Sequence, residues 1–196
     1  METFFTSDTH FGHKKIIEHC ARPFKSVEEM NEAIINRWNS VVNPKDLIYV
    51  LGDFSFVGVN HTKEILKCLN GFKVLIRGNH DHNFKSFEKA DELGFDAMFY
   101  EANIELGPHR VILSHYPYRD DRTVDARYVD RRPKDNGLWL LHGHVHEFWK
   151  IRPESREINV GVDVWNFTPV NSKVLEEIIT NEKATNNEGS QEKANA

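Results

Sequence analysis

The chain has 196 residues, a length that suits a single domain with one sizeable core. Hydrophobic residues make up 39% of it and charged residues 28%, the balance of a globular protein rather than of a disordered one, and no apolar run approaches the roughly 20 residues of a membrane span. A formal net charge of −5 at pH 7 argues against broad, sequence-independent binding to nucleic-acid backbones, because such binding requires a basic surface.

The first half of the chain alternates segments of strand and helix character. Short apolar, β-prone runs predict strands at 4–6, 47–51 and 72–76. Apolar residues at three- and four-residue intervals predict helices at 14–20, 27–41, 62–69 and 84–93. Strands that alternate with helices favour parallel βαβ units, so this half is predicted to be α/β.

The second half is richer in strands. The predicted strands are 98–106, 110–114, 138–141 and 157–164, and Gly107-Pro108-His109 forms a turn that could close a hairpin between the first two. A final helix is predicted at 172–179. Residues 181–196 have almost nothing to bury, so we expect a domain over 1–180 followed by a disordered tail at 181–196.

The start of the chain and its cysteines favour a cytoplasmic protein. The first five residues, from Met1, run straight into a predicted strand and lack the basic start of a signal peptide. The two cysteines, Cys20 and Cys68, lie in predicted helices without a pairing pattern, and we interpret both as reduced thiols. No partner at a membrane is expected, and the sequence does not indicate an oligomeric state.

Polar side chains with metal-binding chemistry follow five predicted strands. They are Asp8 and His10, then Asp53, then Asn79, His80 and Asp81, then His115, and finally His144 and His146. Functional sites in open α/β sheets form at the carboxyl ends of strands, so we expect these side chains to meet at one edge of the sheet.

The chemistry of this set indicates a catalytic metal site. Carboxylates, imidazoles and one amide carbonyl are hard-to-borderline ligands, and no thiolate is among them, which suits Mn, Fe, Co, Ni or Zn better than a structural zinc. Seven ligands, all of these side chains except His80 and Asp81, would be too many for one ion and about right for two ions that share a carboxylate. Two ions roughly 3.5–4 Å apart can clamp a phosphoryl group and generate hydroxide from water at neutral pH.

The order D-x-H, G-D, G-N-H-D, H and G-H-x-H resembles the calcineurin-like metallophosphoesterase superfamily. The match runs from Asp8 to His146 without a missing motif, and the segment 7–14 is also similar to a subgroup of small bacterial and phage phosphoesterases. The resemblance implies an α/β fold of two facing mixed β-sheets flanked by helices.

The resemblance also implies roles for the ligands. The first metal would be held by Asp8, His10 and His146, with Asp53 bridging to the second metal, whose site Asn79, His115 and His144 would complete. His80 would face the scissile phosphate, either to stabilise it or to protonate the leaving oxygen. Asp81 would orient the imidazole of His80.

Other residues have two open interpretations. His13 contacts substrate phosphate or simply begins the helix at Lys14. Arg22 presents its guanidinium to a phosphate, or it pairs with Glu28 or Glu29 to fix its loop. His142 is outside the ligand set, and we favour a structural role for it.

The charged segment 116–137 is either a solvated, self-paired loop or a substrate-facing loop, with Tyr116 and Tyr118 available for stacking.

We therefore predict a hydrolase with two divalent ions, manganese first among them, that prefers phosphodiesters to monoesters and attacks with metal-bound hydroxide. Its substrate would be a phosphorylated small molecule or nucleotide, and nucleic acid is expected only as a substrate. Two alternatives are a nuclease and a binding scaffold that has lost catalysis, as the related retromer subunit has. The scaffold alternative predicts gaps in the ligand set, and every position is filled.

Overall fold

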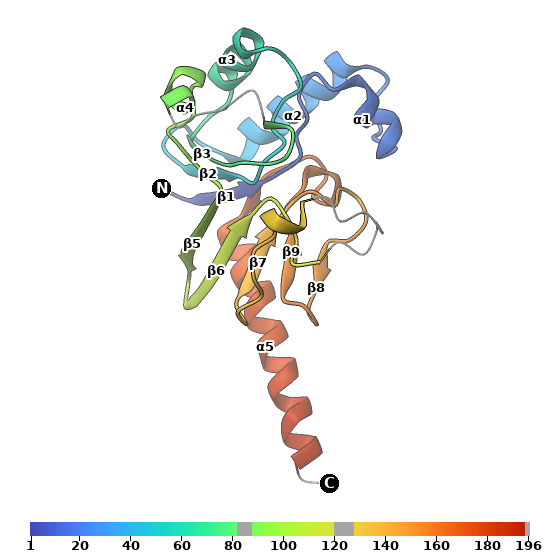
Figure 1. The fold of residues 1–196 in the computed structure, drawn as a ribbon, viewed down its shortest axis with the longest axis vertical. Coiled ribbons are helices and arrows are strands. Elements are labelled where there is room, and N and C mark those ends of the chain that lie inside the picture. Colours follow the sequence, from blue (N-terminus) through green and yellow to red (C-terminus); the bar gives the residue numbers. More distant parts are fainter. Residues whose placement is uncertain (82–87, 120–127, 195–196) are drawn as a thin grey trace.

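Two mixed sheets of five strands each form the framework of the protein (Figure 1). The computed structural model describes residues 1–81, 88–119 and 128–194. The strands are β1 Thr3–Thr6, β2 Leu47–Val50, β3 Phe72–Ile76, β4 Ala97–Phe99, β5 Glu101–Leu106, β6 His109–Ser114, β7 Trp139–His142, β8 Ile151–Arg152, β9 Glu157–Asn159 and β10 Val170–Asn171. Their order is β10-β1-β2-β3-β4 in the first sheet and β5-β6-β7-β9-β8 in the second.

Five α-helices flank the sheets. They are α1 Lys14–His19, α2 Val27–Val41, α3 Val59–Cys68, α4 Glu88–Leu93 and α5 Ser172–Ala194, with short 3-10 helices at Val129–Arg131 (η2) and Val162–Val164 (η3). The helix α2 begins where the Ser26 hydroxyl accepts a hydrogen bond from the Glu29 amide, 3.1 Å away, which satisfies a free N–H of the first turn. Its residues Met30, Ile34 and Trp38 recur every four positions and are buried.

The first sheet is buried on both faces, as the near-continuous apolar strands predict. Alternate residues point to opposite faces, so Phe4 and Leu75 pack with the helices of the first half, whereas Phe5 and Ile76 pack with the second sheet. Figure 1 shows the same layers, with α1 to α4 on the side of the first sheet that faces away from the second. The predicted fold of two facing mixed sheets with flanking helices is confirmed.

Two predicted strands are wrong in extent. The run 98–106 is two strands on either side of Tyr100: β4 pairs with β3 in the first sheet and β5 pairs with β6 in the second. The run 157–164 ends as a strand at Asn159, whose side chain accepts from the Gly161 amide at 2.8 Å and donates to two loop carbonyls, and η3 follows. Local strand propensity does not report which partner a strand finds.

The final helix is longer than predicted, because α5 runs to Ala194 instead of ending at 179. The helix thus continues past the predicted domain boundary at residue 180, and the disorder of the tail stays a prediction. Eight of the fourteen residues from 181 to 194 are Glu, Lys, Ala or Gln, which favour helix, and extending an existing helix needs no new nucleus. Figure 1 shows the end of α5 projecting away from both sheets.

The predicted helix 84–93 is described only as α4, because residues 82–87 lie outside the described part of the chain. None of the helices in the described ranges has the length and apolar character needed to cross a membrane.

Candidate metal centre

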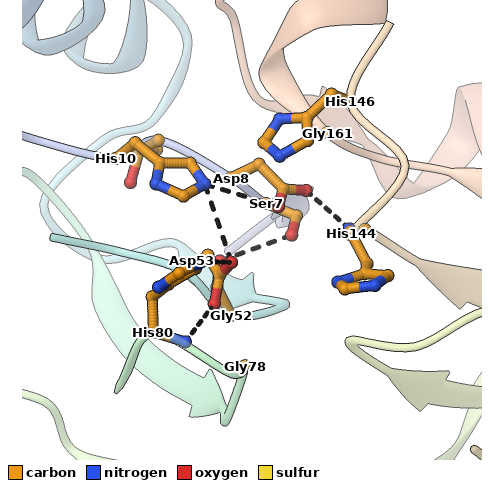
Figure 2. Close-up of polar contacts among 12 residues, drawn as sticks. Ser7, Asp8, His10, Gly52, Asp53, Gly78, His80, His144, His146 and Gly161 are labelled. Carbon is orange, nitrogen blue, oxygen red and sulfur yellow. Dashed lines mark hydrogen bonds and ion pairs between the residues drawn. The ribbon is translucent and has the colours of Figure 1, made fainter. Parts of the chain in front are cut away.

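All seven predicted ligands lie in loops that follow the carboxyl ends of strands. Asp8 and His10 follow β1, Asp53 follows β2, Asn79 follows β3, His115 follows β6, and His144 and His146 follow β7. Because these strands come from both sheets, the site lies where the ends of the two sheets meet. Figure 2 shows Asp8 and Asp53 at the centre, with His10, His80, His144 and His146 around them.

A first cluster consists of Asp8, His10 and His146. One donor atom from each residue lies within 4.8 Å of the others. The Asp8 Oδ1 and His10 Nε2 atoms are buried, 3.9 Å apart, and neither has a hydrogen-bond partner among the described residues. Buried polar atoms nearly always have a partner, so two facing atoms that have none fit a site for a cation.

A second cluster surrounds the Nε2 atom of His115. This nitrogen lies 3.0 Å from Asn79 Oδ1, 3.2 Å from His144 Nδ1 and 3.5 Å from Asp53 Oδ2. The other ring nitrogen of His115 is 2.8 Å from the Leu51 carbonyl oxygen, to which it can only donate. That bond leaves the lone pair of His115 on Nε2, where the other three donor atoms gather.

Asp53 lies between the two clusters. Its Oδ2 atom is 3.6 Å from His10 Nε2 in the first cluster and 3.5 Å from His115 Nε2 in the second. Its Oδ1 atom accepts a hydrogen bond from the His80 amide at 2.8 Å, which fixes the carboxylate in this orientation. One oxygen atom of Asp53 therefore lies close to a histidine of each cluster.

The ligands have strained backbone conformations. Positive φ angles occur at Asp8 (56°), His10 (50°), Asp53 (53°), His144 (71°) and His146 (51°). Such angles are uncommon outside glycine and cost of order 1–3 kcal/mol each when the surrounding structure imposes them. Conformations of this kind concentrate at functional sites, and here they coincide with the predicted ligands.

Two glycines allow the ligand loops to approach one another. A Cβ atom at Gly78 would overlap the Asp53 carboxylate, and one at Gly143 would overlap the Ser7 hydroxyl and the Asp8 carboxylate. Any side chain at either position would push a ligand away, so close packing of the loops requires glycine there.

Burial sets the protonation of the ligands. It raises the pKa of Asp53 well above its ordinary value, and the carboxylates of Asp81 and Asp8 raise it further. Burial also lowers the pKa of His10 well below its ordinary value, and it lowers the pKa of His115. These imidazoles are therefore neutral at pH 7 with lone pairs available, and a cation would relieve the repulsion between the carboxylates.

Residues 1–169 match the calcineurin-like phosphoesterase superfamily domain. The chain belongs to this superfamily.

Relatives of the chain span most of its length. It is 36% identical over 183 residues to the uncharacterized protein MJ1445 of Methanocaldococcus jannaschii, covering 90% of each chain. It is 35% identical over 181 residues to the Gene 66 protein of Mycobacterium phage L5, covering 83% of this chain and 87% of that protein. The crystal structure of the protein of unknown function AQ665 from Aquifex aeolicus is similar with a TM-score of 0.71 and 31% identity, over 91% of this chain and 99% of that one.

Calcineurin-like phosphoesterases use divalent metal ions, and the donor set of this chain fits them. The buried orphan atoms, the neutral imidazoles and the convergence of hard oxygen and imidazole donors are what such ions require. Asp8, His10 and His146 would hold one ion, and Asn79, His115 and His144 the other, with Asp53 between them. The assignment of these residues as ligands stays a prediction.

The structure gives Asp81 a different role from the predicted one. Its Oδ1 accepts from the Phe54 amide at 3.0 Å, and its Oδ2 accepts from the amides of Asp53 at 2.9 Å and Gly78 at 2.8 Å. Asp81 thus ties the loop after β2 to the loop after β3, and the prediction that it orients the His80 imidazole is corrected. His80 itself borders the site with its side chain 39% exposed, and its Nε2 is 3.9 Å from Asp53 Oδ2.

Arg22 does not face a substrate, so that prediction is wrong. The residue is buried, and its Nε and Nη2 atoms donate to the two carboxylate oxygens of Asp163 at 2.8 and 2.9 Å. The guanidinium also donates to the backbone carbonyls of Asp8, at 2.7 Å, and Thr9, at 3.1 Å. Arg22 therefore supports the loop that carries the first ligands, with a partner 141 residues away rather than the neighbouring Glu28 or Glu29.

Asp163 is a site residue that sequence reasoning missed. Its Oδ2 lies 3.2 Å from His146 Nδ1 while it is also paired with Arg22. Burial alone would raise the pKa of Asp163, but His146 and Arg22 outweigh it and the pKa is lowered. The ionised carboxylate accepts a hydrogen bond from His146 Nδ1 at this distance, and in the neutral imidazole this would leave Nε2 for a metal ion. Asp163 belongs to none of the sequence motifs. It lies in η3, within a segment that was predicted to be a strand.

His13 lies at the wall of a cavity of about 380 Å³ beside the first cluster, together with His10, His80 and His146. Its ring stacks on Phe56 with centroids 3.8 Å apart, and its Nδ1 is 3.3 Å from His10 Nδ1. Burial, followed by the charge of His80, lowers the pKa of His13 to about 4. Contact between His13 and a substrate phosphate stays a prediction, and any such contact would come from a neutral imidazole.

The tyrosines predicted for stacking are used within the protein. Tyr116 is buried with its ring centroid 5.2 Å from that of His144, and Tyr118 donates from its hydroxyl to the Leu138 carbonyl at 3.1 Å. The middle of their loop, 120–127, lies outside the described residues. His142 is buried, with Nδ1 2.8 Å from the Gly143 carbonyl, in keeping with a structural role.

Replacing Asp163 by Asn is expected to weaken Mn²⁺ binding at the first cluster by about 10- to 100-fold, the usual cost of losing a carboxylate behind a metal-bound histidine. Calorimetric titration of the chelator-treated protein measures this. Asp135→Asn is the matched control, because Asp135 pairs with Arg156 at 2.7 Å on the surface, away from the ligands. Equal Mn²⁺ affinity in the two variants would show that Asp163 does not support metal binding.

Proposed function

We propose that this calcineurin-like phosphoesterase is a binuclear metal-dependent phosphodiesterase that hydrolyses diesters in preference to monoesters. The observation that carries the proposal is the position of Asp53 Oδ2, which is nearly equidistant from a histidine of each cluster, at 3.6 and 3.5 Å. A carboxylate oxygen shared in this way is what a pair of ions requires.

Two bound ions would supply positive charge for the phosphoryl oxygens and lower the pKa of bound water towards neutrality. The protein provides the rest. Asp8 and Asp53 are held by backbone hydrogen bonds in loops that the structure constrains tightly, so the ligands need little reorganisation. His80 and His13 border the cavity on the side of the first cluster and are placed to contact the ester.

His80 is placed to assist the hydrolysis of a diester. The leaving group of a diester, like that of an alkyl monoester, is an alkoxide that needs a proton, and a positioned imidazole can deliver one. The half-exposed ring of His80 lies beside the bridging carboxylate, at the border between the ligands and the cavity.

A small phosphorylated molecule or nucleotide fits the proposal better than a nucleic acid, because the net charge of −5 disfavours binding a long polyanion. A binding scaffold is disfavoured, because every ligand position is filled and the ligands converge. Cys20 and Cys68 are free thiols, which supports a cytoplasmic location.

The test is a metal-reconstituted assay of matched esters. The purified protein is stripped with a chelator, reloaded with Mn²⁺, Fe²⁺, Co²⁺, Ni²⁺ or Zn²⁺, and assayed with p-nitrophenyl phosphate, bis(p-nitrophenyl) phosphate and a single-stranded oligonucleotide. We expect about two ions per chain, no turnover without metal, the best recovery with Mn²⁺ and faster turnover of the diester. Full activity with one tightly held ion per chain would contradict the binuclear proposal. Faster turnover of the monoester than of the diester would contradict the substrate preference.

A further inference from the structure

A second cavity of about 380 Å³ lies beside the second cluster. Its lining includes Gly78 and Tyr116, which are the chain neighbours of the ligands Asn79 and His115. A molecule bound to the metals therefore has this cavity next to it, on a different side from the cavity that His13 lines.

Three arginines from two distant segments converge on this cavity. Arg77 follows β3, and Arg131 and Arg132 lie at the end of η2. Among the described residues, none of these guanidinium groups forms an ion pair with a carboxylate. Arginine stays charged in proteins, so the lining holds three cations that no ion pair within the described chain neutralises.

Arg77 lines the cavity, and one of its N–H groups has no hydrogen-bond partner among the described residues. Its Nη1 donates to the Tyr100 hydroxyl at 2.6 Å and its Nη2 to the Asp81 carbonyl at 3.3 Å, which fixes the plane of the guanidinium. Its Nε is buried and has no hydrogen-bond partner among the described residues. The two hydrogen bonds hold the charged guanidinium group in place in the lining of the cavity.

The charge of the lining favours an anion. Glu101 and Asp130 also border the cavity, so five charged side chains leave a balance of one positive charge. The chain as a whole carries a formal charge of −5, so the lining differs in sign from the net charge of the chain. Planar guanidinium groups bind phosphate oxygens in pairs, which makes a phosphate the anion that this lining suits best.

We propose that the cavity binds a second, non-scissile phosphate of the substrate through Arg77, Arg131 and Arg132, so that the preferred substrate is a phosphodiester that carries a further phosphate group. This inference rests on the proposed function, because the metals must hold the scissile phosphate. The arginines lie outside the ligand set, so they select the substrate rather than take part in the bond cleavage.

The kinetic test compares two diesters that differ in one group, the p-nitrophenyl ester of thymidine 5′-phosphate and the same ester with an added 3′-phosphate. We expect the added phosphate to raise kcat/KM by about tenfold or more, mainly through KM, as charge-assisted hydrogen bonds predict. In Arg132→Gln and Arg131→Gln the ratio of the two values should fall towards one. Arg110→Gln, which removes an exposed arginine of β6, is the matched control and should keep the ratio.

A binding measurement separates this inference from the proposed function. Calorimetry on the Mn²⁺-loaded protein compares thymidine 3′,5′-bisphosphate with thymidine 5′-phosphate, and neither needs to be hydrolysed. We expect the bisphosphate to bind about tenfold more tightly and to lose that advantage in Arg132→Gln. Failure to turn over either diester would reject the proposed function while calorimetry still decides the inference. Equal affinities, or an advantage that survives in both arginine variants, would overturn it.

Discussion

Asp53→Asn is expected to be the most damaging change of a single ligand, with a loss of more than about 100-fold in kcat/KM, since changing a residue behind the ligands already costs 10- to 100-fold. Asn keeps the volume of the side chain, and its carbonyl can still accept the hydrogen bond from the His80 amide, which is 2.8 Å long. The substitution removes the charged oxygen that lies 3.6 Å from His10 and 3.5 Å from His115, so both clusters should lose metal.

The measurement is metal content per chain together with kcat/KM for a diester. His146→Asn is the matched comparison. His146 belongs to the first cluster, so this substitution should lower the metal content by about one ion per chain. A variant at Asp53 that retains two ions, or that loses less activity than His146→Asn, would argue against a shared carboxylate.

His80→Ala should have the second-largest effect, and its size should depend on the leaving group. An imidazole that protonates the leaving oxygen contributes typically 10²–10⁴-fold, so a dinucleoside phosphate with an alkoxide leaving group should lose activity in this range. A diester with a nitrophenolate leaving group, which departs without a proton, should lose far less. Rates with the two diesters at saturating Mn²⁺ provide the measurement.

Asp81→Asn serves as the contrast to His80→Ala. Because Asp81 accepts hydrogen bonds from three backbone amides of the ligand loops, the substitution should disturb both leaving groups alike and lower the melting temperature. Equal losses for both diesters in His80→Ala would instead make His80 a residue that binds the phosphate.

The sequence was sufficient to predict which side chains meet at the candidate metal centre. Each ligand stands directly after an apolar strand, and the ends of parallel strands meet at one edge, so spacing alone brought Asp8, Asp53 and Asn79 together. The motif resemblance then supplied the fold, which the strand order confirms.

The supporting residues could not be predicted in the same way. Arg22 and Asp163 are 141 residues apart, and only the completed fold places them behind His146. Asp81 was assigned to its neighbour His80, whereas its partners lie mostly across the gap between two strands. The predicted helix ends at residue 179, whereas α5 continues to Ala194. Low apolar content indicates that a segment has little to bury, but it does not indicate whether the backbone can continue an existing helix.

The origin of the ligands in both sheets has a consequence for folding. The sequence from Asp8 to His146 must be complete, and the two sheets must be docked, before either cluster can form. Bound ions would then act as cross-links between the sheets and would stabilise only the fully assembled state, by a free energy that grows with metal concentration. In a metal-poor cell the protein would lose stability along with activity. The supply of metal would then determine the amount of folded protein as well as its rate of turnover.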